Sequence, residues 1–386
     1  MIKRSTFFLL ISLAICLKMF LFVFAEIHEP QAKFQNDSWR YLQTGTSLMR
    51  DGVFAIKDQD GNFQPETYRT PGYPAFLGFL REGLGLPFWG IILLQIFLTL
   101  CVAWMVYVVV LLMNPRIAPL SALIMLFDPA INLFALLLLS ETLFMFCLVL
   151  FLVSFIHYIR NRKILILLIS SLCLVLATYI RPISFYLGYF LLIFFALDFK
   201  RNKVLKSFTG MLIFLIVLYS FLGLWQYRNN RATHQKTFCA AIDSTLLASG
   251  LMHSYAKNED PYTQGMSPPL YYLNVSSRSF MSLMTRPASF KYFKAPWLKT
   301  AGKIFSYPWI TFWLAGLVIG IKKGWRNPND QFLIIVVLYF ILSSCIGALW
   351  LVGSRFRVPM MPFIAILSAQ GWSQIVSFLK TKISRS

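Results

Sequence analysis

Charged side chains are scarce in this sequence. Asp, Glu, Lys and Arg together make up 13% of its 386 residues, whereas soluble domains hold about 25%. Apolar residues make up 58%, and the mean hydropathy is +0.64. So large an apolar fraction excludes both an ordinary soluble domain and a disordered chain. The composition therefore predicts an all-α integral membrane protein with several spans.

Residues that form disulfides or bind metals are also few. Of the cysteines only Cys239 lies in a polar stretch, which excludes an intrachain disulfide framework, and no Cys-x-x-Cys pair is present. The four histidines are scattered. We therefore expect no cofactor; a divalent metal is possible but nothing in the sequence indicates one. The patterns of P-loops and dinucleotide sites are missing, which argues against an ATP-driven pump.

Acidic residues are outnumbered: 15 Asp and Glu stand against 36 Lys and Arg, a formal net charge of +21. In a soluble chain this excess would favour a nucleic-acid partner. Here 16 of the 36 basic residues gather in alternate connections between apolar runs, as the positive-inside rule describes for cytoplasmic loops, and most of the others lie in two long loops that are largely exempt from it. We therefore expect no nucleic acid as partner, and both termini on the cytoplasmic side.

Apolar runs of the roughly 20 residues that cross a bilayer recur along the chain. Single spans are predicted at Phe7–Ala25, Phe88–Met113, Val204–Trp225, Gln331–Leu351 and Val358–Phe378. We expect the first of these runs to be retained as a span rather than cleaved as a signal peptide.

Two further runs are long enough for two spans each. Ile117–Ile159 is predicted to kink at Pro129 and to turn at Ser140-Glu141, and Ile164–Phe199 to divide at Arg181-Pro182. Pro308–Ile321 is shorter but apolar. The sequence thus predicts about ten transmembrane helices in one membrane domain, residues 1–386.

Two long connections fall on the predicted outer side. They are residues 26–87 and residues 226–307, and both are expected to contain short helices. In the first, a short amphipathic helix is predicted from Trp39 to Met49, with Asp37 or Ser38 as its N-cap. Capping is one explanation of Asp37; the other is a carboxylate held at the membrane surface for function. Asp60-Gly61 predicts a hairpin turn rather than a calcium loop.

Arginines are unusual on the predicted outer side. Arg181, Arg355 and Arg357 each lie near a proline at the end of an apolar run. They are either interfacial anchors or parts of an anion site, since a guanidinium can donate two hydrogen bonds to one phosphate. The same two interpretations apply to Arg69. It lies in a turn with Tyr68, Tyr73 and two prolines, and could anchor the interface or contact a phosphate or sugar.

Five segments, in this order, resemble the GT-C family of polyprenyl-phosphate-sugar-dependent glycosyltransferases, which includes protein O-mannosyltransferases and aminoarabinose transferases. They are Asp37-Ser38-Trp39-Arg40-Tyr41, Arg69–Pro74, Ser140-Glu141, Arg181-Pro182 and Arg355–Pro362. The order agrees over residues 1–375. The family often has a second acid where Ser38 stands, which puts metal coordination in doubt. We also expect no soluble C-terminal domain, so the acceptor class stays open.

The resemblance implies an enzyme of a bacterial inner membrane. It would move a sugar from a polyprenyl-phosphate-linked donor to a hydroxyl or amine of a lipid, glycan or protein acceptor on the periplasmic face, in contact with membrane lipids and with inversion. Asp37 would be the general base. The donor phosphate would be bound by Arg69, Arg181, Arg355 and Arg357, with Tyr41, Tyr68, Tyr73 and Glu141 in support and no metal.

The same resemblance suggests that the loop 26–87 carries the catalytic residue and that the loop 226–307 covers the donor or acceptor. A lipid flippase or transporter is the alternative. Transporters usually place ionisable residues near the middle of the bilayer and often contain internal repeats. In this sequence the unusual charges gather at the predicted outer edge and no repeat is visible.

Overall fold

The computed structural model describes residues 3–201, 204–241, 264–288, 290–325, 327–347 and 353–383. Residues 242–263 of the second long loop and 348–351 of the predicted run Gln331–Leu351 lie outside this part. The predicted all-α membrane fold is confirmed. In the described ranges eight helices are long and apolar enough to cross a membrane, or nine with one bent pair.

Four of these spans are α1 (Arg4–His28), α4 (Phe88–Met113), α7 (Glu141–Asn161) and α15 (Pro296–Gly324). The others are η2 (Pro182–Ser184) with α9 (Leu187–Phe190) and α10 (Leu192–Phe199), α11 (Val204–Thr233), α16 (Pro328–Gly347), and α17 (Ser354–Arg357) with η4 (Val358–Met360) and α18 (Met361–Ile383). The predicted count of about ten is reached only if the bent pair and the 17-residue α8 (Ile164–Ile180) are also counted.

Prolines break the helices where the sequence predicted. The bent pair consists of α5 (Ala118–Leu126) and α6 (Pro129–Ala135), which meet at 53°. Helix α7 begins after Ser140, and α8 ends before Arg181-Pro182. Proline has no N–H for the helix ladder, so each break exposes main-chain groups that other atoms must satisfy. At the first break the Asp128 carboxylate accepts from two amides of α6.

Two predicted spans are shorter than the helices that form. Helix α11 continues past Trp225 to Thr233, and α15 begins at Pro296 rather than at Pro308. Pro308 lies inside α15, which a membrane helix tolerates when neighbouring groups satisfy the freed carbonyl. A span predicted from hydropathy ends at the first polar residues. The helix itself continues, because its main-chain hydrogen bonds do not depend on the polarity of the side chains.

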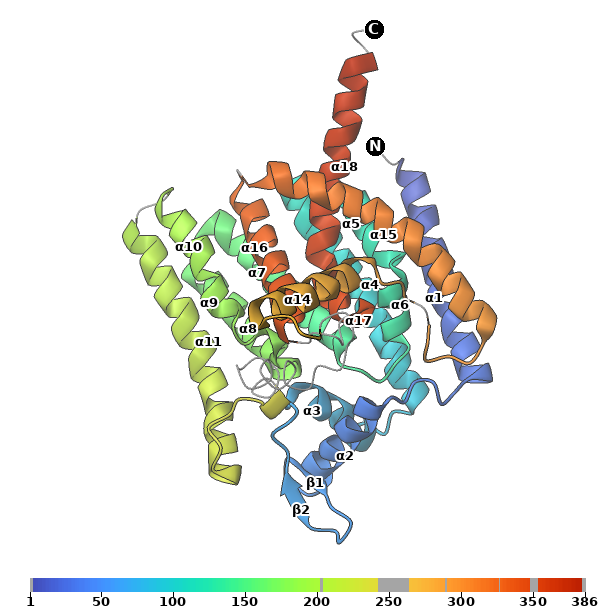
Figure 1. The fold of residues 1–386 in the computed structure, drawn as a ribbon, viewed down its shortest axis with the longest axis vertical. Coiled ribbons are helices and arrows are strands. Elements are labelled where there is room, and N and C mark those ends of the chain that lie inside the picture. Colours follow the sequence, from blue (N-terminus) through green and yellow to red (C-terminus); the bar gives the residue numbers. More distant parts are fainter. Residues whose placement is uncertain are drawn as a thin grey trace.

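The two chain ends lie at one end of the bundle, and the first long loop covers the other (Figure 1). That loop forms α2 (Asn36–Arg50), an antiparallel hairpin of β1 (Ala55–Lys57) and β2 (Phe63–Pro65), and α3 (Gly72–Gly78), which continues into a π turn at Phe79–Gly83. The hairpin turn predicted at Asp60-Gly61 is confirmed. We call these two ends the termini end and the hairpin end.

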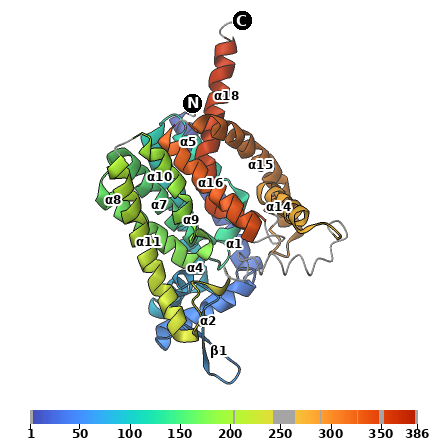
Figure 2. The ribbon, with the colours of Figure 1, turned by 60° about the vertical axis from the view of Figure 1, so that its left-hand side comes forward.

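The described part of the second long loop forms one substantial helix, α14 (Pro268–Thr285). It packs against α15, α16 and α17, on one flank of the bundle (Figure 2). Helix α7 is buried among the other spans, where Phe155 stacks on Phe332 with ring centroids 4.4 Å apart. The first residue of this buried helix, Glu141, therefore has a fixed position.

Candidate active site

Asp37 lies in the first turn of α2, not at its cap. The helix begins at Asn36 and Gln35 is the N-cap, because the Gln35 amide donates to Ser38 Oγ over 2.9 Å. Ser38 Oγ in turn donates to the Leu138 carbonyl over 2.8 Å. This corrects the predicted cap and start of the helix. With Ser38 turned inward, the Asp37 side chain is 22% exposed and is not used for capping.

Arg69 is delivered to Asp37 by the turn before α3. Its Nη2 donates to Oδ1 of Asp37. The buried carboxylate of Glu66 accepts from the amides of Tyr68 (2.5 Å) and Arg69 (3.1 Å), which fixes this turn. A Cβ at Gly72 would lie 2.8 Å from the Tyr179 carbonyl, so only glycine lets the turn approach the end of α8 this closely. Arg69 is thereby brought near Arg181.

Glu141 is fully buried at the start of α7. Its Oε1 accepts from Nη1 of Arg181 and Nε of Arg355, while Oε2 is buried without a hydrogen-bond partner. The positive end of the α7 dipole favours an ionised carboxylate at this position. Glu141 therefore anchors two guanidiniums from different parts of the chain.

Arg355 joins the two acids. Its Nε donates to Glu141, and its Nη2 donates to Oδ2 of Asp37 over 2.9 Å. Arg69 completes the arrangement from the other side of Asp37, so that three guanidiniums contact two carboxylates. The convergence predicted for Asp37, Arg69, Arg181 and Arg355 is thus present, with one positive charge in excess. We call these four residues and Glu141 the acid–arginine cluster.

Arg357 does not join this cluster. Its guanidinium is buried and donates to the carbonyls of Leu283, Met284 and Arg286 at the end of α14, and it lies 5.5 Å from the Trp313 ring centroid. The expected convergence of Arg357 with the other arginines is therefore wrong. Residues two apart on a helix point about 200° apart, because each residue turns the helix by about 100°. The two-residue spacing of Arg355 and Arg357 therefore already indicated that their side chains point in different directions.

The three predicted tyrosines differ in position. The Tyr41 ring lies 5.5 Å from the Arg69 guanidinium, and the half-exposed Tyr68 ring lies 5.0 Å from it. Tyr73 is fully buried and donates to Oε1 of Gln95 over 2.8 Å. Burial raises the pKa of the Tyr73 phenol well above its ordinary value. Tyr41 and Tyr68 therefore border the cluster. Tyr73 does not contact Arg69 but packs against the ring of Tyr41.

Sequence reasoning assigned no role to two residues around the cluster, Glu66 and Tyr292. Glu66 positions Arg69 and also pairs with Arg40, whose side chain is 42% exposed. Tyr292, from the second long loop, lies within electrostatic range of Arg355, Glu141 and Asp37. Burial raises the pKa of Tyr292, so its hydroxyl is protonated at neutral pH. Glu66 was visible in the turn motif, but no local pattern links Tyr292 to the site.

The charges around Asp37 do not favour a metal. Glu141 is the other acid of the cluster, and both carboxylates are already bonded to guanidiniums. No group of three His, Cys, Asp or Glu in the described ranges could hold a metal ion. The chemistry available here is a carboxylate base next to guanidiniums that bind anions.

No family model and no curated protein matches this sequence. Solved structures do match. The oligosaccharyltransferase of Archaeoglobus fulgidus, in complex with Zn and sulfate, aligns over 96% of this chain and 50% of its own, with 13% identity and a TM-score of 0.58. Apo ArnT from Cupriavidus metallidurans aligns over 97% of this chain and 62% of its own, with 12% identity and a TM-score of 0.56.

The archaeal oligosaccharyltransferase AglB from A. fulgidus, with an inhibitory peptide and a dolichol-phosphate, aligns over 99% of this chain with 13% identity and a TM-score of 0.54. This chain spans about half of the oligosaccharyltransferase and three fifths of ArnT. At this level of identity the likeness concerns the fold. These neighbours are GT-C proteins, which confirms the predicted resemblance: the chain has the GT-C fold.

Proposed function

We propose that this protein is a membrane glycosyltransferase that moves a sugar from a polyprenyl-phosphate-linked donor to a hydroxyl or amine acceptor. One observation carries the proposal: Arg355 joins Asp37 to Glu141, with Arg69 and Arg181 on either side. Such a cluster combines the two groups that sugar transfer from a phosphate requires, a base and preorganised cations.

The excess charge of the cluster suits an anionic donor. Three guanidiniums against two carboxylates leave one positive charge at the end of an apolar bundle, where the phosphate of a membrane lipid would lie. A structural neighbour, the archaeal AglB, is described in complex with an inhibitory peptide and a dolichol-phosphate. That complex supports a lipid-phosphate donor for the fold, while the sugar and the acceptor of this chain are left open.

The proposed reaction is a single displacement. The acceptor oxygen or nitrogen attacks the anomeric carbon and loses its proton to Asp37, while the bond from that carbon to the phosphate oxygen breaks. The electron pair stays on the lipid phosphate, where Arg69, Arg181 and Arg355 stabilise the growing negative charge. A displacement of this kind inverts the anomeric centre, and no residue has to form a covalent intermediate.

Asp37 is not free before the donor binds. Arg69 donates to its Oδ1 and Arg355 to its Oδ2, so both carboxylate oxygens already accept a hydrogen bond. A donor phosphate that accepts hydrogen bonds from Arg69 and Arg355 would release Asp37 as a base at the moment it is needed. Glu141 is buried and would keep Arg181 and Arg355 in place throughout.

The orientation follows from the basic connections. We propose that the hairpin end faces the periplasm of a bacterial inner membrane and that both termini are cytoplasmic. The loop 26–87 would then supply the base, and the loop 226–307 would cover the donor or acceptor. Tyr292 of the second loop lies within electrostatic range of Arg355, Glu141 and Asp37. We propose that transfer needs no metal and survives a chelator.

The test uses purified protein, a radiolabelled polyprenyl-phosphate sugar and a membrane extract as acceptor. Label should move to an acceptor with the native protein and with Asp60→Asn, an exposed acid on the hairpin. It should not move with Asp37→Asn, which keeps the shape of the side chain but removes its basicity. Full transfer by Asp37→Asn would remove the base from the proposal.

A lipid flippase is the second candidate, and one observation favours it. Lys18 is buried in α1, donates to Asn132 and interacts electrostatically with the buried Asp128. Ionisable groups therefore do lie within the spans. Movement of labelled lipid between leaflets without sugar transfer would establish this candidate. If the native protein both moves lipid between leaflets and transfers sugar, the glycosyltransferase proposal is kept.

A further inference from the structure

A non-helical stretch of the chain lies buried directly before Glu141. Helix α6 ends at Ala135 and α7 begins at Glu141, and the residues between them, 136–140, are all buried. Non-helical main chain among membrane spans is tolerated only where protein groups satisfy its N–H and C=O groups. The residues that satisfy this stretch therefore also decide where Glu141 lies.

Gln95 of α4 satisfies two carbonyls of the chain that leads into α7. Its Nε2 donates to the carbonyl of Ala135 over 3.2 Å and to that of Leu137 over 2.7 Å. Ser38 donates to the next carbonyl, that of Leu138. A buried carbonyl that loses its donor is costly, so these hydrogen bonds fix the path of the chain into α7.

The same side chain also holds the tyrosines next to the acid–arginine cluster. Oε1 of Gln95 accepts from the Tyr73 hydroxyl over 2.8 Å. The Tyr73 ring packs edge-on against the Tyr41 ring with centroids 4.9 Å apart, and the Tyr41 ring lies 5.5 Å from the Arg69 guanidinium. Gln95 is thus connected to Glu141 through the main chain and to Arg69 through two aromatic rings.

The three hydrogen bonds of Gln95 require a primary amide of this length. They use two donors and one acceptor, and a primary amide is the only side-chain group that offers both. Methionine has a similar length but no N–H donor, and asparagine is one methylene shorter. Gln95 is fully buried and its amide is bonded within the protein, so it does not contact a substrate.

We propose that Gln95 is a positioning residue for sugar transfer, an inference that rests on the proposed function. It keeps the guanidiniums of Arg69 and Arg355 in place beside Asp37, the first through the tyrosines and the second through Glu141. Loss of its hydrogen bonds should lower kcat by about 10- to 100-fold, the scale of a small misplacement of catalytic groups. A role in stability alone would lower the melting temperature and leave the kcat of the folded protein unchanged.

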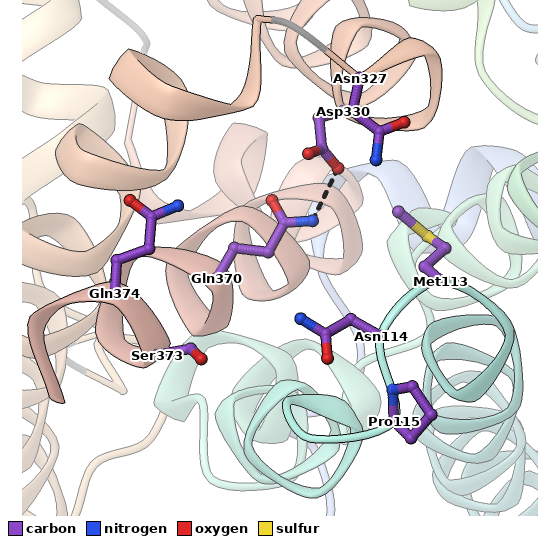
Figure 3. Close-up of a pocket in the computed structure, with 8 residues that line it drawn as sticks. All are labelled: Met113, Asn114, Pro115, Asn327, Asp330, Gln370, Ser373 and Gln374. Carbon is purple, nitrogen blue, oxygen red and sulfur yellow. Dashed lines mark hydrogen bonds between the residues drawn. The ribbon is translucent and has the colours of Figure 1, made fainter. Parts of the chain in front are cut away.

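The experiment measures kcat, the KM for a labelled polyprenyl-phosphate sugar and the melting temperature of the full chain in one detergent. Gln95→Met keeps the length of the side chain and removes its three hydrogen bonds. Gln370→Met on α18 is the matched control. Gln370 donates to Asp330 beside a cavity at the termini end of the bundle, away from the cluster (Figure 3). This control also removes a hydrogen bond from a span, and it should keep the native kcat.

A double variant tests whether Gln95 acts through the cluster. It combines Gln95→Met with Arg355→Lys. If both changes misplace the same guanidinium, the loss of kcat in the double variant is smaller than the product of the two single losses. Losses from independent sites multiply, because their free energies add.

A kcat of Gln95→Met below that of Gln370→Met, with losses that do not multiply in the double variant, supports the proposal. Equal kcat values of Gln95→Met and Gln370→Met overturn it, and so do losses that multiply. If Gln95→Met does not fold, Gln95→Asn, which keeps the amide but shortens its reach, decides by the same measurements. Absence of sugar transfer by the native protein is a different result, since it overturns the proposed function and this inference with it.

Discussion

Arg355 donates to Asp37 over 2.9 Å across 318 residues of sequence. The same guanidinium donates to Glu141 through Nε. Two acids in the first turns of α2 and α7 are thus held by one side chain from the short helix α17. Because a guanidinium has a rigid fork of donors, it can satisfy both carboxylates at once. This geometry leads to the first prediction.

Arg355→Lys should slow sugar transfer by about 10²–10³-fold, the cost of losing one preorganised donor to developing negative charge. An ammonium is a point charge and cannot span both acids in the same way. The measurement is kcat with a labelled polyprenyl-phosphate sugar. Arg81→Lys, an exposed change on the π turn, is the matched control and should keep the native rate. An unchanged kcat in Arg355→Lys would discard the phosphate role of this arginine.

Glu141→Gln should destabilise the protein by about 3–5 kcal/mol, because it removes the buried partner of two guanidiniums. Glu82→Gln is the comparison. Glu82 pairs with Arg50, whose side chain is 66% exposed, and surface pairs of this kind are worth about 0–1 kcal/mol. Thermal unfolding of both variants in the same detergent measures the difference. Equal melting temperatures would show that Glu141 does not hold the cluster together.

Arg357→Met should lower thermal stability without raising KM for the donor. Its guanidinium satisfies three carbonyls at the end of α14 and does not face Asp37. Arg355→Ala should instead raise KM for the donor, because Arg355 belongs to the acid–arginine cluster. Melting curves and donor kinetics of the two variants check this contrast. A raised KM at unchanged stability in Arg357→Met would return this residue to the phosphate site.

Glu66→Gln should reduce kcat by roughly 10- to 100-fold, the scale of a small misplacement of a catalytic group. A neutral amide cannot accept equally well from the Tyr68 and Arg69 amides and from Arg40. Arg40→Gln should cost far less, since Arg40 is half exposed and does not contact Asp37. Steady-state kinetics separate the two. Native kcat in a folded Glu66→Gln would show that Arg69 needs no such support.

The local properties of this chain were readable from its sequence. Hydropathy along the chain located the spans, and prolines located the breaks at Pro129 and Pro182. The order of short polar motifs between the spans pointed to the GT-C fold. Each of these signals depends on neighbouring residues only, because a bilayer imposes length and polarity on every helix separately.

Which side chains meet was decided by the tertiary structure. Asp37, Glu141 and Arg355 come from three helices, and their contact depends on how those helices pack, which no local pattern encodes. Arg357 was grouped with Arg355 because both lie near a proline on the predicted outer side, although helix geometry turns its side chain away from Arg355. The sequence by itself determined where the chain crosses the membrane and which charges lie at its edges. Packing alone decided which of those charges pair, since an ion pair needs atoms within a few ångströms and sequence order does not set that distance.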